Sequence, residues 1–158
     1  MPGTVERIAI TSTQSALPEV VESVEVLAGQ GPRGDRYFVD QPTERDGDDL
    51  TLIEAEALEA FEDETGIELS HSESRRNVLT RGVRLNELVG RRFRVGEVEC
   101  VGVELCEPCK HLEGLTRPGV LRGMVHRGGL RANVTRSGTI ATGDELAELG
   151  ASIAPASG

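Results

Sequence analysis

The stretch SESRRNVLTRGVRLNELVGRRFRVGEVECVGVELCEPC, residues 72–109, holds most of the features that decide the fold. A strand is predicted at 76–80, and two further strand segments are predicted over 91–105 with a bend near Gly96. Between them, residues 85–90 are typical of a short helical turn that a glycine ends. The residues of this turn that we expect to face the core are Leu85, Leu88 and Val89.

Upstream of this stretch, the pattern predicts two strands, a surface loop and a helix. The strands are expected at 4–11 and around Val26, and the polar residues 41–49 are expected to form the surface loop. A helix is predicted at about residues 52–65, because Thr51-x-x-Glu54 matches a capping box and Gly66 can end the helix. Its apolar stripe would be Ile53, Ala57, Leu58 and Phe61.

Downstream, a second short helix is predicted at 119–126, after Pro118, and more strands follow around a turn at Ser137. The pattern contains no internal repeat and no linker. Short strands joined by glycine-rich turns, with two or three short helices, predict a compact, barrel-like, mostly-β domain. We expect a single domain over 1–150 and a flexible tail over 151–158.

The charge balance narrows the classes of partner. The 158 residues include 27 acidic and 17 basic side chains, for a net charge of -10, and Lys110 is the only lysine. Phosphate backbones would be repelled, so non-specific nucleic-acid binding is disfavoured. An acidic, arginine-rich composition is compatible both with a salt-tolerant, halophilic protein and with a GC-rich genome.

Targeting signals are absent from the pattern. The first residues lack the basic and apolar regions of a signal peptide, and no apolar run approaches the length of a membrane span. Three cysteines cannot all pair in disulfides. These features predict a cytoplasmic protein with reduced thiols and no membrane contact.

The motif Cys106-x-x-Cys109 admits three interpretations: a zinc site, a redox pair and a single functional thiolate. Zinc lacks ligands at suitable spacing, and a thioredoxin-like pair lacks its βαβ context. Cys109 lies between a proline and Lys110-His111, where the positive surroundings would favour a thiolate. Cys100, within a strand, is expected to be a buried apolar cysteine.

Two arginines and an asparagine, Arg75, Arg76 and Asn77, begin the strand after residue 74. Guanidinium groups bind phosphates and carboxylates in a fork geometry. In so acidic a chain, ordinary pairing with surface carboxylates is the simpler explanation. A functional role requires that these residues share a pocket with Cys109.

Taken in order, the motifs resemble those of the MOSC domain, the C-terminal domain of molybdenum-cofactor sulfurases. The resemblance covers residues 5 to about 148. The matching segments are Gly34-Asp35, Arg76-Asn77, Gly82 to Gly90, Phe93 to Val98, Pro108-Cys109 and Gly138 to Asp144. After Gly-Asp many relatives have a histidine and a glycine, whereas Arg36, Tyr37 and Phe38 follow here.

The resemblance implies a β-barrel-like MOSC fold and a molybdenum cofactor (molybdopterin). By position, Cys109 would carry sulfur or bind molybdenum, and Cys106 would be a bystander or a resolving thiol. The phosphate-bearing pterin would be bound by Arg75, Arg76, Asn77 and Lys110. The domain is expected to stand alone, without a desulfurase domain.

Three functions remain open at this stage. The chain is an oxidoreductase that reduces N-hydroxylated substrates with electrons from a partner protein, or a non-catalytic sulfur carrier or cofactor-binding module served by a sulfur-donor protein. In the third case the site has lost its activity.

Overall fold

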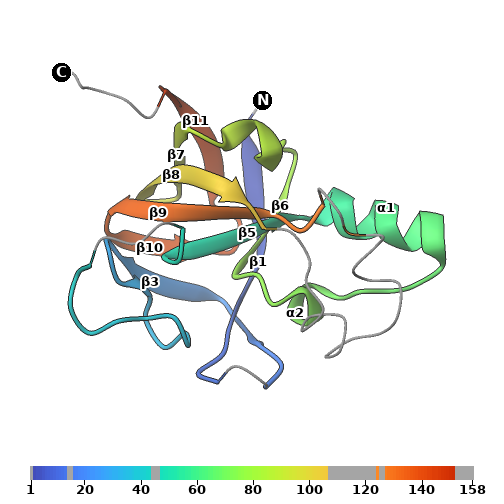
Figure 1. Ribbon diagram of the computed structural model, residues 1–158, viewed down its shortest axis with the longest axis horizontal. Coiled ribbons are helices and arrows are strands. Elements are labelled where there is room, and N and C mark those ends of the chain that lie inside the picture. The colour runs from blue at the N-terminus through green and yellow to red at the C-terminus, as the bar shows by residue number, and fades with distance from the viewer. Residues whose placement is uncertain (1, 14–15, 44–46, 107–123, 125–126, 152–158) are drawn as a thin grey trace.

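The computed structural model describes residues 2–13, 16–43, 47–106, 124 and 127–151 (Figure 1). Its main element is a closed barrel of strands. The barrel strands are β1 (Gly3–Ile10), β5 (Leu50–Glu54), β6 (Val78–Arg81), β7 (Arg91–Val95), β8 (Val98–Leu105), β9 (Leu130–Arg136) and β11 (Glu145–Ala151). The remaining strands are β2 (Glu19–Val21), β3 (Ser23–Leu27), β4 (Gly31–Pro32) and β10 (Gly138–Ala141).

The barrel closes because β11 pairs with both β7 and β1, in the latter case through Gly3 opposite Leu146. The order around the ring is β11-β7-β8-β9-β5-β6-β1. A ring with an odd number of strands cannot be antiparallel throughout, and the β5–β6 pair is the parallel one. β2 extends the sheet beyond β1, and β10, β3 and β4 form a separate small sheet. The mostly-β, barrel-like prediction is therefore confirmed.

Parallel neighbours need a crossover, and helices supply it here. α1 (Ala55–Thr65) follows β5 directly, and α2 (His71–Ser74) precedes β6. A short 3-10 helix, η1 (Leu85–Leu88), then leads to β7. In Figure 1, α1 and α2 lie together at one side of the barrel. No helix within the described residues has the length and apolarity that crossing a membrane requires.

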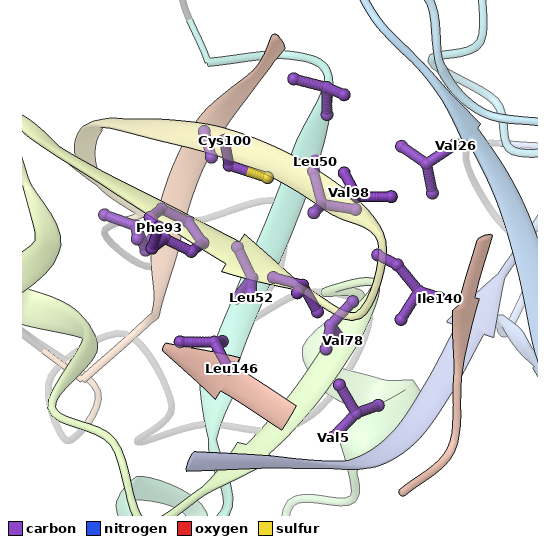
Figure 2. Close-up of a cluster of buried hydrophobic side chains, with 14 of the residues drawn as sticks. Val5, Val26, Leu50, Leu52, Val78, Phe93, Val98, Cys100, Ile140 and Leu146 are labelled. Carbon is purple, nitrogen blue, oxygen red and sulfur yellow. The ribbon is translucent and has the colours of Figure 1, made fainter. Parts of the chain in front are cut away.

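The core fills the barrel with aliphatic side chains and one phenylalanine (Figure 2). Leu50 and Leu52 from β5 meet Phe93 from β7 and Leu146 from β11 there, all at most 1% exposed. Alternation along β8 and β9 places every second side chain inside. Cys100 lies in this core at 1% exposure, and burial raises the pKa of its thiol, as expected for an apolar cysteine.

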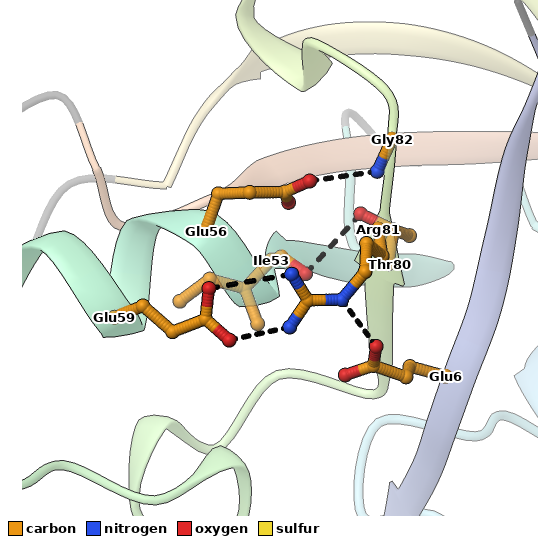
Figure 3. Close-up of polar contacts among 7 residues, drawn as sticks. All are labelled: Glu6, Ile53, Glu56, Glu59, Thr80, Arg81 and Gly82. Carbon is orange, nitrogen blue, oxygen red and sulfur yellow. Dashed lines mark hydrogen bonds and ion pairs between the residues drawn. The ribbon is translucent and has the colours of Figure 1, made fainter.

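A second, smaller cluster joins α1 to the outside of the barrel wall. Its buried members are Ile53, Ala55, Leu58, Phe61, Leu69, Leu79 and Met124. At the edge of this contact, Arg81 of β6 binds Glu59 of α1 and Glu6 of β1 (Figure 3). The Glu56 carboxylate also accepts a hydrogen bond from the Gly82 N–H at 2.8 Å. These contacts fix how α1 lies on the barrel.

The predicted helix exists, but its predicted start is wrong. Residues 51–54 belong to β5, and the helix begins at Ala55, with no side-chain hydrogen bond at its N-cap Glu54. The supposed capping box fails because Asn77 accepts hydrogen bonds from Thr51 N–H and Oγ1, while Glu54 accepts one from Leu85 N–H. A true capping box lies at Ser70, which starts α2. The predicted stop at Gly66 is confirmed by its left-handed conformation.

Two smaller expectations need correction. Val89 is 41% exposed and does not face the core, although Leu85 and Leu88 do. Within the expected surface loop at 41–49, Gly47 is buried and Asp49 is 2% exposed, where its carboxylate accepts a hydrogen bond from Val134 N–H. Apart from Met124, the predicted helix at 119–126 lies outside the described residues, as does the tail from residue 152.

Candidate functional site

A cavity of about 480 Å³ on the outer wall of the barrel brings together most of the predicted site. It lies across outward-facing side chains of β5, β8 and β9, beside α2 and the loop that follows β4. Cys106 contributes a thiol to its lining, and the other polar side chains are Arg36, Tyr37, Asp48, Thr51, Arg75, Arg76, Asn77, Glu104 and Arg131. A space of this size suits a small organic ligand. A larger hollow of about 610 Å³ beside η1 and β11 has no cysteine in its lining.

The Asn77 side chain connects two strands at the wall of the cavity. Its Oδ1 accepts from Thr51 N–H and Oγ1, both at 3.2 Å, and its Nδ2 donates to the Ala9 carbonyl at 3.3 Å. Through these bonds Asn77 ties β1 to β5 just before β6 begins. Its carboxamide is therefore committed to protein groups, and its contribution to the site is to place its two neighbours.

Arg75 ends α2 in the left-handed conformation, at φ 64°, a region that is unfavourable for residues with a Cβ. Its side chain is 8% exposed and donates to the Ala16 and Thr13 carbonyls, at 2.8 and 3.4 Å. Left-handed backbone in a non-glycine residue marks a position that the surroundings must impose. Here it turns the Arg75 side chain toward the loop that follows β1.

Arg76 points to the opposite side of the pocket. Its Nε donates to the Gly128 carbonyl at 2.7 Å. Its own carbonyl accepts from His71 Nε2 at 2.9 Å, which assigns the ring proton to that nitrogen. Burial lowers the pKa of His71 to about 4, with repulsion from Arg7 adding to the effect, so this imidazole is neutral at pH 7.

Several positive side chains gather at this site. Burial, followed by repulsion from Arg36, lowers the pKa of the Arg75 guanidinium, and Arg76 also repels it. Among the residues that the structure describes, no carboxylate pairs with Arg36 or Arg76. The arginines repel one another, and an anion bound among them would offset that repulsion.

Arg131 differs from Arg36 and Arg76 because it forms ion pairs with two carboxylates. Its guanidinium pairs with Asp48 and, at 2.8 Å, with Glu104. Burial works to lower the pKa of Arg131, but the bond to Asp48 and attraction from Glu104 and Cys106 together raise it. The two carboxylates hold the Arg131 guanidinium in place near Cys106.

Cys106 lies at the edge of the described chain. It is 5% exposed, and its N–H donates to the Gly129 carbonyl at 2.7 Å, which ties the end of β8 to the start of β9. Cys109 and Lys110 lie outside the described residues, so their predicted roles stay predictions. Among the described residues, no group of three or more histidine, cysteine or acidic side chains could hold a metal ion.

Sequence reasoning missed several cavity residues, among them Arg36, Tyr37 and Arg131. Arg36 and Tyr37 follow Gly34-Asp35, a motif that could have indicated them. Arg131 is paired with Thr51 across β5 and β9, and nothing in its local sequence distinguishes it from other arginines of the strands. Its place depends on pairing between distant segments.

Comparison with known proteins bears on the family and the fold of the chain. The sequence profile of the MOSC domain matches residues 41–147. The YuaD protein of Bacillus subtilis superposes with a TM-score of 0.78 at 18% identity, covering 92% of this chain and 94% of that one. YiiM of Geobacillus stearothermophilus gives 0.73 at 16% identity, covering 94% and 75%. YiiM of Escherichia coli gives 0.65 at 19% identity, covering 94% and 70%. No curated protein sequence matches the chain significantly.

Proposed function

The chain belongs to the MOSC domain family, and we propose on this basis that it binds the phosphate-bearing pterin of the molybdenum cofactor in the cavity beside α2. The observation that carries the proposal is the gathering of three arginines, Arg36, Arg75 and Arg76, in the lining of one cavity, where Arg36 and Arg76 pair with no carboxylate among the described residues. Guanidinium groups with free N–H donors are the groups that recognise a phosphate in proteins. The cofactor's phosphate would lie among these three side chains.

The residues present fit such a ligand in charge, size and ligand chemistry. The cavity of about 480 Å³ lies within the range of small-molecule sites, and a thiol opens onto it. Thiolate sulfur is a soft ligand that suits a transition metal. Arg36 and Arg76 would bind the phosphate directly, while Asn77 would hold the backbone that presents them.

We assign the functional sulfur to Cys109, with Lys110 and His111 stabilising its thiolate form. Cys109 follows Cys106 by three residues, and a segment of that length spans at most about 11 Å. Its sulfur can therefore act at the same cavity. The bound molybdenum would supply a redox centre for removing oxygen from an N-hydroxylated substrate, with electrons from a separate protein.

The alternative is a module that carries sulfur or cofactor and does not turn over a substrate. In that case Cys109 would hold sulfur as a persulfide received from a sulfur-donor protein. The arginine cluster favours cofactor binding over sulfur carriage alone, because a persulfide on a single thiol does not require several cations.

Loading of two serine variants tests the assignment. Full-length wild type, Cys109→Ser and Cys106→Ser are produced in a host that makes the cofactor, and molybdenum, phosphorylated pterin and cyanide-labile sulfur are measured per chain. We expect Cys109→Ser to lose molybdenum or labile sulfur, and Cys106→Ser to keep most of both. Equal loss in the two variants would indicate a paired site, and loss in Cys106→Ser alone would identify the other sulfur. Labile sulfur without molybdenum in the wild type would favour the carrier.

A further inference from the structure

The loop that follows β4 presents a flat surface to the cavity. Tyr37 lines the cavity and is 43% exposed, which is unusual for a large aromatic side chain. The Arg36 guanidinium lies over the Tyr37 ring, with Cζ 4.7 Å from the ring centroid. Tyr37 and Arg36 therefore line the same cavity as Arg75 and Arg76, which are proposed to bind a phosphate with Arg36.

The backbone of this loop is held in place from both sides. Asp35, 6% exposed, accepts hydrogen bonds from Thr11 N–H at 3.1 Å and from Tyr37 N–H at 3.4 Å. Arg36 N–H donates to the Thr11 carbonyl at 2.6 Å, and Phe38 N–H donates to the Asp35 carbonyl at 3.0 Å. An exposed ring on a fixed backbone loses little conformational freedom when a ligand covers it, so the loop is preorganised for binding.

The cation beside the ring adds selectivity for the ligand's charge. Arg36 stacks on Tyr37 and also lies close enough to Arg75 to lower the pKa of that guanidinium. A ligand that has both a flat ring and an anionic group can therefore use both parts of the surface at once. An apolar ring would leave the cations unpaired, and inorganic phosphate would leave the ring exposed.

We propose that Tyr37, supported by Arg36, is a stacking platform that selects anionic ligands with a planar heterocycle of pterin or purine type. This inference rests on the proposed function, because it assumes that the cluster of Arg36, Arg75 and Arg76 binds the anionic group. It adds a specificity-determining residue on the early loop. Stacking of one ring on one aromatic side chain is worth about 1–3 kcal/mol, so the platform alters affinity by about tenfold or more.

The chain offers a direct probe of this platform. Tyr37 is its only tyrosine, and it has no tryptophan, so intrinsic tyrosine fluorescence reports on Tyr37 alone. Full-length protein from a cofactor-deficient host is titrated with guanosine monophosphate, guanosine and inorganic phosphate, and N-acetyltyrosinamide corrects for absorbance. We expect the nucleotide to quench Tyr37 and to bind more tightly than either of the other probes, while phosphate binds without quenching.

Two variants separate stacking from folding. By calorimetry, we expect Tyr37→Leu to weaken the nucleotide about tenfold and to leave phosphate binding within about twofold, whereas Tyr37→Phe keeps the wild-type affinity for both. Circular dichroism checks that both variants fold.

These measurements test the stacking platform at Tyr37 separately from the proposed anion site. Nucleotide binding no tighter than phosphate binding in the wild type, or unchanged in Tyr37→Leu, would overturn the stacking platform and leave the anion site standing. Failure of the wild type to bind either phosphate or the nucleotide would overturn both the platform and the proposed anion site.

Discussion

His71 is a buried side chain that contacts the backbone of the cavity residue Arg76. It is 2% exposed, its Nε2 donates to the Arg76 carbonyl, and its Nδ1 has no hydrogen-bond partner among the described residues. Protonation would place a charge in this buried position, close to Arg7 and the arginine cluster. Burial therefore makes the neutral imidazole the favoured form in the folded chain, with its Nε2–H on the Arg76 carbonyl.

The pKa of His71 predicts a specific loss of stability in acid. Because the folded value is about 4 and the ordinary value is about 6.5, the unfolded chain binds a proton first as the pH falls. Stability is therefore full above about pH 6.5, and this group alone removes about 2 kcal/mol between about pH 7 and pH 5. Urea unfolding at both pH values should show a smaller acid loss in His71→Gln than in wild type. Equal losses would show that His71 does not titrate in this way.

At the scale of elements, the site depends on the close approach of β5 and the start of β9. Gly129 has φ 107°, and a Cβ there would lie well inside contact distance of the Leu52 carbonyl oxygen. The same glycine accepts the Cys106 N–H, and its neighbour Gly128 accepts Arg76 Nε. The absence of a side chain at Gly129 thus lets β5, Cys106 and Arg76 meet.

Alanine substitutions at two glycines separate backbone strain from crowding. Gly143 has φ 94°, and nothing lies within 4 Å of a Cβ built there, so it is a matched control. Gly143→Ala should cost about 1–2 kcal/mol from left-handed strain alone. Gly129→Ala should cost at least about 2 kcal/mol more, because the Leu52 backbone must also move. Chemical denaturation measures both, and similar costs would refute the packing argument.

Some helix and strand boundaries could be predicted from the sequence alone, and others could not. Strands β7, β8 and β9 could be predicted because one face of each is buried and the apolar residues alternate. The start of α1 could not be predicted, because Thr51-x-x-Glu54 satisfies a local rule, whereas in the structure Thr51 donates its hydrogen bonds to Asn77 Oδ1. A local pattern cannot show a partner that lies 26 residues away.

The candidate site also contains residues that the sequence could indicate and residues that it could not. Arg75 and Arg76 could be indicated because they are adjacent and precede a strand, and the structure places both at one cavity with Cys106. Arg36 and Arg131 join them only through the arrangement of the barrel. A local sequence cannot show which arginines pair with carboxylates, because folding brings the partners together: Arg131 pairs with Asp48 and Glu104, whereas Arg36 and Arg76 pair with no carboxylate among the described residues.

At the scale of the whole molecule, the contrast is between an acidic protein and a basic cavity. Most arginines of the strands are paired on the surface, for example Arg94 with Glu145 and Arg136 with Glu99. Exposed pairs of this kind contribute little to stability. The field of the molecule disfavours anions in general, so an anionic ligand must be recognised by direct contact with the cavity arginines.

Pterin binding by charge-matched double variants tests the central claim most directly. Arg36→Gln/Arg76→Gln removes two unpaired cavity cations, and Arg94→Gln/Arg136→Gln removes two paired surface cations with the same change in net charge. Each hydrogen bond to a charged group is worth about 1.5–3 kcal/mol, so the cavity variant should bind at least 100-fold more weakly. Phosphorylated pterin retained per chain is measured after production in a host that makes the cofactor. The account predicts wild-type retention in the surface variant and background retention in the cavity variant, and equal retention in both would contradict it.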